Sequence, residues 1–140
     1  MLNISELASR LHKETEWQKT PVELADEDYR DMVIYGLRKL LIDTCRAQMY
    51  DGALLTEDSE TGEINYDIKL DIDEEEYILL VAQQQFYRRV ANDVNNIVGY
   101  TTDALTVTNA DKPYANIKDT LGNLENERRI LYFKMCRYAM

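Results

Sequence analysis

The sequence predicts a mainly α-helical fold, a bundle of about four helices into which an acidic β-hairpin is inserted. Three long segments repeat apolar residues at spacings of three and four, which is the pattern of an amphipathic helix. One segment, residues 63–72, alternates apolar and polar residues, which is the pattern of a half-buried strand. A chain of 140 residues is long enough for one core. We therefore expect a single helical domain over residues 1–140, with an arm at residues 51–72 between two long helices.

A short first helix is expected over residues 3–12, and a long second helix from Asp26 to about Tyr50. The apolar face of the first helix consists of Ile4, Leu7, Ala8 and Leu11. The second helix carries a continuous apolar stripe of Tyr29, Met32, Val33, Gly36, Leu37, Leu40, Leu41, Thr44 and Cys45. Glycine costs about 1 kcal/mol relative to alanine inside a helix. Its place on the stripe therefore predicts a close helix crossing at Gly36.

Two further helices are expected after the arm. The first begins at Asp73, with Glu76 completing a capping box, and ends at Gly99. Residues 100–111 are expected to be irregular, with a short extended piece at residues 104–107. The last helix is expected from about Tyr114 to Tyr138, and the segment from residue 112 onward is basic, with six basic and three acidic residues.

The arm is expected to be a hairpin with strands at residues 53–56 and 63–70 around a turn at residues 57–62. The second strand would present its apolar residues on one face: Ile64, Tyr66, Ile68 and Leu70. An isolated two-stranded hairpin is marginally stable in water. This face is therefore expected to pack either on the helices or on another subunit, while the arm as a whole is held out from the helical body.

The negative charge of the protein is concentrated in one segment, which we call the acidic stretch, residues 51–76. It contains eleven acidic residues and one lysine, and its net charge equals the formal charge of −10 of the whole chain. The acids expected to serve a channel or an interface are Asp58, Glu60, Glu63 and Asp67. An acidic chain is a poor binder of nucleic-acid phosphates, which need clustered lysine and arginine.

The residue types of common active sites and metal sites are sparse. One histidine, His12, and two distant cysteines give no zinc-binding pattern, and the five glycines form no phosphate-binding loop. Cys45 and Cys136 are interpreted as reduced packing residues on helices, as in a cytoplasmic protein. A calcium loop starting at Glu57 fails at its twelfth position, which holds Ile68 instead of glutamate. We therefore expect no enzymatic activity, no cofactor, no metal and no membrane span.

Several aromatic and basic residues are candidates for subunit contacts, because tyrosine, tryptophan and arginine are enriched at protein interfaces. Trp17 lies in a polar connection and is interpreted either as an anchor on the core or as a contact with another subunit. The other candidates are Arg88, Arg89, Arg128, Arg129, Tyr132 and Tyr138.

One segment resembles a helix of small phage head–tail connector proteins, and two others resemble segments of small phage virion proteins. The run Tyr77-Ile-Leu-Leu-Val-Ala-Gln-Gln-Gln-Phe-Tyr-Arg-Arg89 is similar to a helix of that family, in which an apolar run precedes an aromatic and basic end. The segments Asn109-Ala-Asp-Lys-Pro-Tyr and Leu124-Glu-Asn-Glu-Arg-Arg-Ile-Leu-Tyr are similar to small virion proteins of phages that infect low-GC bacteria. The order of helices and the extended insertion also resemble the connector family, although the last helix is longer here.

The resemblance implies a structural virion protein, made in the host cytoplasm and located in the head–tail neck. Such proteins form a ring, commonly of twelve copies, that docks below the portal protein, meets a downstream neck or tail protein and continues the DNA channel without binding DNA specifically. The acidic arm would then either line the channel and repel DNA or contact a partner, including the basic last helix of a neighbouring copy. Two alternatives stay open: another tail or baseplate component, and a small acidic adaptor or regulatory module of the cytoplasm.

Overall fold

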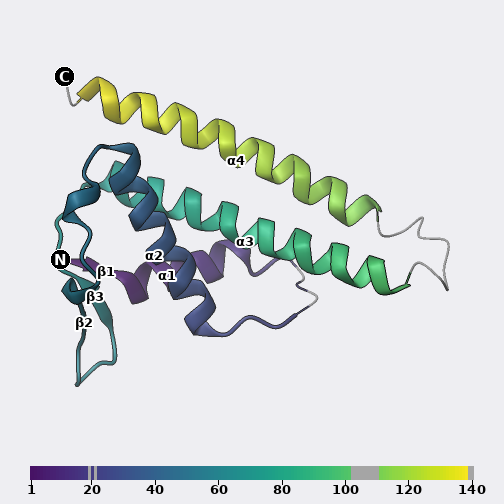
Figure 1. Cartoon of the computed structure of the whole chain (residues 1–140), viewed down its shortest axis with the longest axis horizontal. Helices are drawn as coiled ribbons and strands as arrows, with labels where there is room; N and C mark the ends of the chain where they lie inside the picture. The colour runs from purple at the N-terminus through teal and green to yellow at the C-terminus, as the bar shows by residue number, and fades with distance from the viewer. Residues whose placement is uncertain (19, 21, 102–110, 139–140) are drawn as a thin grey trace.

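The computed structural model describes residues 1–18, 20, 22–101 and 111–138. Within this part, four α-helices form a bundle: α1 (Ile4–Thr15), α2 (Asp26–Asp43), α3 (Ile72–Thr101) and α4 (Asp111–Tyr138). A small antiparallel sheet sits at one side of the bundle (Figure 1). The predicted fold class, a mainly helical bundle with a hairpin between the second and third helices, is confirmed.

α1 forms where expected and continues three residues further than the predicted end at residue 12. Asn3 caps its first turn, because its Oδ1 accepts a hydrogen bond of 2.9 Å from the backbone N–H of Glu6. The predicted apolar face is buried against the rest of the bundle. In the last turn the buried Thr15 hydroxyl donates to the carbonyl of Leu11 at 2.8 Å, so a polar residue ends the helix without losing a hydrogen bond.

α2 ends at Asp43, so the predicted end near Tyr50 is wrong. Cys45 adopts a left-handed conformation with φ of 60°. The backbone N–H of Cys45 then donates to the carbonyl of Ile42 at 3.1 Å, and that of Arg46 donates to the carbonyl of Leu41 at 2.6 Å. This pair of bonds is a Schellman cap, a motif that usually has glycine at the left-handed position. Cys45 is consequently exposed in the cap, and its predicted packing role on a helix is also wrong.

The close crossing predicted at Gly36 is confirmed. α2 passes over α3 at this point, and a Cβ atom on Gly36 would lie 2.5 Å from the carbonyl oxygen of Ile78. That distance is below any van der Waals contact, so only glycine fits the crossing as it stands. The two helices thereby bury Leu37 and Leu40 from α2 against Ile78 and its neighbours in α3.

The sheet contains a third strand that was not predicted from the sequence. β1 (Leu2–Asn3) pairs with β3 (Ile64–Tyr66), and β3 pairs with β2 (Leu55–Glu57), so the hairpin gains a third strand from the N-terminus. Each strand is only two or three residues long, which is shorter than the predicted strand at residues 63–70. Two short 3₁₀ helices, η1 (Ala47–Met49) and η2 (Gly52–Leu54), connect α2 to β2.

The second half of the arm belongs to the core, so the expectation of an arm held out as a whole is wrong. Tyr66 and Ile68 are buried, and Ile64 and Leu70 are half-buried against the same apolar cluster. The Tyr66 hydroxyl accepts a hydrogen bond of 2.7 Å from the N–H of Asp51 and donates one of 3.1 Å to the carbonyl of Met49. Of the arm, the hairpin tip projects from the bundle (Figure 1).

The boundaries of the last two helices differ from the prediction by a few residues. α3 starts at Ile72, because Asp71 rather than Asp73 is its cap: its Oδ1 accepts from the N–H of Glu74 at 2.9 Å. The helix continues through Gly99 to Thr101, and α4 begins at Asp111 rather than Tyr114. The predicted extended piece at residues 104–107 lies outside the described residues.

α4 runs along α3 at the edge of the molecule (Figure 1). Its inward side contributes Ile117 and Leu124 to the core, and Leu131 and Met135 are half-buried against it. On its outer side, by contrast, Ile130 is 59% and Phe133 is 69% exposed. α4 therefore has an apolar outer face that the described residues do not cover.

Candidate functional site

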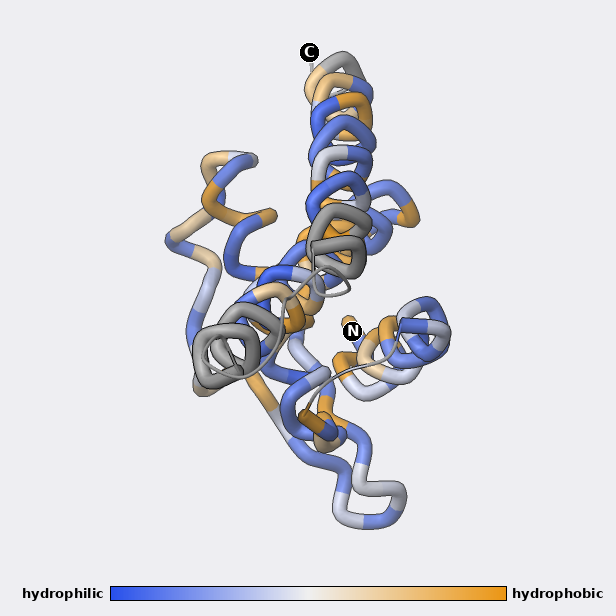
Figure 2. The backbone as a smooth tube through the Cα atoms, turned by 90° about the vertical axis from the view of Figure 1, so that its right-hand side faces the viewer, coloured by the Kyte–Doolittle hydropathy of each residue, from blue (hydrophilic) through white to orange (hydrophobic). Residues whose placement is uncertain are grey.

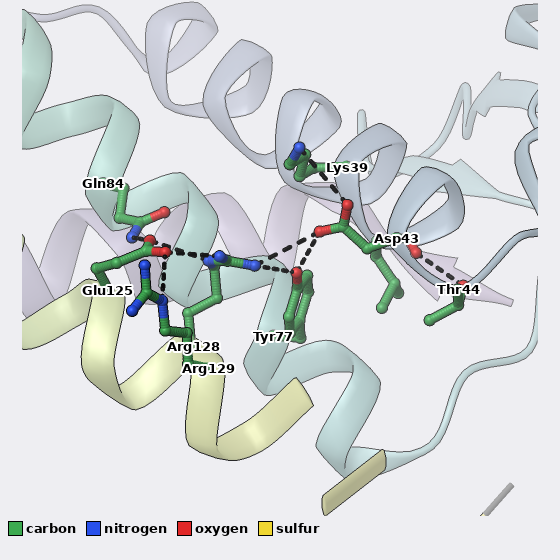
Figure 3. A network of polar contacts seen from close by, with 9 residues as sticks. Lys39, Asp43, Thr44, Tyr77, Gln84, Glu125, Arg128 and Arg129 are labelled. Atoms are coloured by element: carbon green, nitrogen blue, oxygen red, sulfur yellow. Dashed lines mark hydrogen bonds and ion pairs between the residues drawn. The ribbon is translucent and has the colours of Figure 1, made fainter. Parts of the chain in front are cut away.

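A polar network joins α2, α3 and α4 beside the uncovered face of α4 (Figure 3). At its centre, the hydroxyl of Tyr77 donates to a carboxylate oxygen of Asp43 and accepts a hydrogen bond of 2.7 Å from Nη1 of Arg128. The same guanidinium nitrogen lies 3.6 Å from the Asp43 carboxylate. One side chain from each of three helices thus meets at a single point.

The network continues along α4 through Glu125. Arg128 binds this carboxylate with two nitrogens, Nη2 at 2.6 Å and Nε at 3.0 Å, which is the strong bidentate geometry. Gln84 of α3 donates to Glu125 at 2.7 Å, and Nε of Arg129 donates to it at 3.3 Å. Each charged group at the centre of the network therefore has a partner of opposite charge, and the network fixes α4 on α3.

The pKa values in the network follow from these contacts. The hydrogen bonds from Arg128 lower the pKa of the Glu125 carboxyl from its ordinary 4.5 to about 2, and the bond from Gln84 adds to this effect. Burial, followed by the hydrogen bond to Asp43, raises the pKa of the Tyr77 hydroxyl well above its ordinary value. Tyr77 therefore keeps its proton and Glu125 stays charged near neutral pH, which suits a structural connection between helices.

The charge of Glu125 is expected to make the fold sensitive to acid. Because folding lowers its pKa from 4.5 to about 2, the ionised carboxylate stabilises the fold above about pH 4.5, and this stabilisation is lost as the pH falls towards 2. Glu125→Gln should therefore reduce the loss of stability across this window by about 1 kcal/mol, a figure that allows for solvent screening of a partly exposed group. Urea unfolding at several pH values measures this difference in stability between the variant and the unmodified protein.

Glu127→Gln is the matched control, since Glu127 is an exposed glutamate of the same helix. Its pH profile should overlay that of the unmodified protein. Equal acid sensitivity in the Glu125→Gln variant and the unmodified protein would show that the contacts of Glu125 do not contribute to stability.

A groove lies next to the network, between the end of α2 and the C-terminal half of α4. It has a volume of about 410 Å³ and is lined by Asp43, Arg128, Arg129, Tyr132 and Phe133. The rings of Tyr132 and Phe133 meet edge to face, with centroids 6.1 Å apart. We call this feature the α4 groove. It combines an apolar wall with guanidinium groups, which is the chemistry of a protein-binding surface.

The predicted arm residues divide into two groups. The acids Asp58, Glu60, Glu63 and Asp67 are exposed, and the first three stand on the projecting tip. In contrast, Ile64, Tyr66, Ile68 and Leu70 face the bundle, where they are buried or half-buried. The structure therefore separates the predicted site into a charged outer part and an inner part that anchors it.

The tip and the α4 groove lie at opposite edges of the subunit. Figure 1 shows the hairpin at the bottom and the C-terminal end of α4 at the top, and Figure 2, turned about the vertical axis, shows the same separation. The two surfaces also differ in charge. Residues 57–63 contain four acids and no base, whereas the α4 groove is lined by two arginines and one aspartate, and Glu125 pairs with both arginines.

The other predicted contact residues have mixed positions. Trp17 is 66% exposed, although its ring lies 6.1 Å from that of the buried Tyr87 and its Nε1 donates to the carbonyl of Glu14 at 2.9 Å. Arg88 is exposed, and Arg89 is exposed but paired with Asp28 at 3.0 Å.

On α4, the structure brings Arg128, Arg129 and Tyr132 together at the groove. Arg128, predicted as an exposed contact, is instead mostly enclosed by its own chain. Tyr138 ends α4, and its side chain lies outside the described part of the structure.

Four residues of this site were not predicted from the sequence: Asp43, Tyr77, Glu125 and Phe133. Glu125 could have been found, because acids and bases three and four residues apart face each other on a helix. Asp43 and Tyr77 carry no such signal: they are 34 residues apart, and only the packing of α2 on α3 brings them together.

Comparison of the chain with protein-family models, with curated proteins and with solved structures finds no match. Among the described residues, no group of three or more histidine, cysteine, aspartate or glutamate side chains is arranged to hold a metal ion. Within the same residues, every helix is too short or too polar to cross a membrane.

Proposed function

We propose that the chain is the repeating subunit of a phage head–tail connector ring, which docks below a portal protein and continues the DNA channel towards the tail. The observation that carries this proposal is the placement of two different surfaces, an acidic tip and the α4 groove with its exposed aromatic ring, at opposite edges of one subunit (Figures 1 and 2). A surface pair of this kind favours heterologous, head-to-tail contact, and repeated heterologous contacts close into a ring when the rotation between copies permits it.

A symmetric dimer would use the same charges less well. Pairing the acidic edges of two copies would oppose carboxylates, which is unfavourable by several kcal/mol for closely spaced like charges. Pairing the α4 edges would likewise bring basic segments together. Head-to-tail contact avoids both pairings, because the acidic edge of each copy meets the α4 edge of the next copy.

The rigidity of the body also suits a ring subunit. The Gly36 crossing fixes α2 on α3, and the network of Asp43, Tyr77 and Arg128 fixes α4 on both. A subunit held in this way keeps the angle between its two edges constant, which a closed ring requires. The ring number expected from the connector resemblance is twelve, and the negative surface of the subunits would let DNA pass without adhering.

The chain should be recovered from purified phage particles of the strain that encodes it. Peptide mass spectrometry with labelled standards should give about as many copies of this chain as of the portal protein, because the two rings stack in the connector family that the sequence resembles. Absence of the chain from intact particles would end the connector proposal. A free monomer or dimer bound to a host protein would then favour the regulatory module that the sequence analysis left open.

A further inference from the structure

A second pocket lies between α1 and the first turns of α2, and we call it the α1–α2 pocket. It has a volume of about 220 Å³. Its polar lining consists of Ser5, Ser9, His12, Asp26, Tyr29 and Arg30. None of these residues lines the α4 groove, so the two sites are separate.

The pocket contains two opposite charges that do not pair. Asp26 and Arg30 are four residues apart on α2, a spacing at which opposite charges on a helix attract each other. Among the described residues, however, neither side chain forms an ion pair, with the other or with a third group. Asp28, in the same turn as Asp26, is by contrast paired with Arg89 at 3.0 Å. Both charges of the pocket are therefore available to a ligand.

The guanidinium of Arg30 calls for an anionic acceptor. Its Nε is buried and makes no hydrogen bond to any residue that the structure describes. A buried donor without an acceptor is unfavourable, and more so when the group is charged. A carboxylate matches a guanidinium well, because its two oxygens accept two parallel hydrogen bonds. A ligand of this pocket should therefore carry a carboxylate.

Asp26 determines the second group of the ligand. A simple anion would pair with Arg30 but would be repelled by the Asp26 carboxylate, since like charges close together are unfavourable. A ligand with an ammonium group next to its carboxylate pairs with both side chains. Free α-amino acids have this arrangement. The size of the pocket agrees, because sites for larger, drug-sized ligands have volumes of about 300–1,000 Å³.

The remaining lining suits a short side chain on the ligand. The Ser5 hydroxyl oxygen accepts a hydrogen bond of 2.8 Å from the N–H of Ile64, so its own proton is free to bond a ligand oxygen. The rings of His12 and Tyr29 stack with centroids 4.6 Å apart and form a flat wall. Ala8, which is buried, adds an apolar surface.

We propose that the α1–α2 pocket binds a free α-amino acid with a short side chain, with Arg30 holding its carboxylate and Asp26 its ammonium group. The bound molecule would bridge α1 and α2 and, through Ser5, the strand β3. This inference does not depend on the proposed ring, because the pocket is formed within one copy of the chain.

Nuclear magnetic resonance of the Arg30 Nε–H group tests the site in the unmodified chain. Titration with L-alanine should give a saturable shift of this signal, which the Arg30→Lys variant identifies by its loss. Propionate lacks the ammonium group of L-alanine, and ethylammonium lacks the carboxylate. Each should bind at least tenfold more weakly than L-alanine, because each leaves one charge of the pocket unpaired.

Two results of the titration would overturn the proposal. Propionate that binds as tightly as L-alanine would show a simple anion site in which Asp26 has no role. The absence of a saturable shift with L-alanine would show that the pocket holds solvent only. Both results concern the unmodified chain, so they do not depend on the folding of any variant, and neither bears on the connector ring.

Variants assign the two charges. Arg30→Gln and Asp26→Asn should each weaken the binding of L-alanine at least tenfold, followed by the shifts of backbone amides around the pocket. Arg10→Gln is the matched control, since Arg10 is an arginine of α1 that pairs with Glu76 and does not line the pocket. It removes the same charge and should leave the affinity unchanged. An equal loss of affinity in Arg10→Gln and Arg30→Gln would mean that the overall charge of the chain, not the pocket, attracts the ligand.

Discussion

Replacing Gly36 by alanine is expected to lower the free energy of unfolding by about 3 kcal/mol, because the added methyl group overpacks the close crossing of α2 and α3. Its carbon would lie 2.5 Å from the Ile78 carbonyl oxygen and 3.1 Å from the Ile78 Cγ2. The first of these neighbours is backbone, so the clash cannot be relieved by a side-chain rotation. α2 and α3 would have to separate, and the core between them would lose contacts. Urea unfolding measures the change.

Gly122→Ala is the matched control for this substitution. Gly122 lies within α4, and nothing lies within 4 Å of the position that its Cβ would take. Alanine there should raise the stability by about 0.5–1 kcal/mol through its higher helix propensity. If Gly36→Ala raised the stability as Gly122→Ala is expected to do, the close approach of α2 to the Ile78 carbonyl would not be a real constraint on the fold.

Tyr66→Ala is expected to lower the free energy of unfolding by about 4 kcal/mol, which is typical for loss of a fully buried aromatic ring. Tyr66 is fully buried and stacks on Tyr50, with ring centroids 5.9 Å apart. It also pairs with Leu2 on one side and Leu55 on the other, at the centre of the sheet. Its loss should therefore weaken the sheet and the attachment of the hairpin together.

Tyr66→Phe separates the ring from its hydroxyl. This variant keeps the packing and loses the two bonds to Asp51 and Met49, so it should cost about 1 kcal/mol. Amide hydrogen exchange should then show faster opening of residues 49–57 than of α3. Tyr66→Ala and Tyr66→Phe with the same small effect would contradict the conclusion that the inner half of the arm is part of the core.

The helical part of the fold could be predicted because its signal is local. The apolar stripe of α2 as far as Leu41 and the apolar residues between Tyr77 and Val90 in α3 repeat at the helical period, and both sets are buried as expected. The close crossing at Gly36 could be predicted for the same reason. A glycine on an apolar stripe destabilises the helix, and close packing against a second helix compensates for this cost. These features depend on residues a few positions apart, which a single sequence displays.

The remaining features depend on contacts between distant segments. β1 has only two residues, and it is a strand because β3 lies beside it. The end of α2 depends on a cysteine that adopts the conformation usually reserved for glycine. The network needs Asp43, Tyr77 and Arg128 from three helices. Periodicity and composition contain no information on contacts between distant segments, so the enclosure of Arg128 by its own chain could not be predicted before the fold was known.

The structure narrows the interpretation of the acidic stretch. Its inner residues, Tyr66 and Ile68, hold the hairpin on the bundle, and its last acids start α3. The part left for a partner is the tip, residues 57–63, whose backbone is ordered before any contact is made. A firmly anchored and rigid tip suits a contact with fixed geometry between subunits better than it suits a flexible tether.

Electron cryomicroscopy of the neck in intact particles tests the central claim most directly. We expect a ring between the portal and the tail whose subunit density fits the four helices and the small sheet. A neck in which no layer accommodates this fold would contradict the connector assignment.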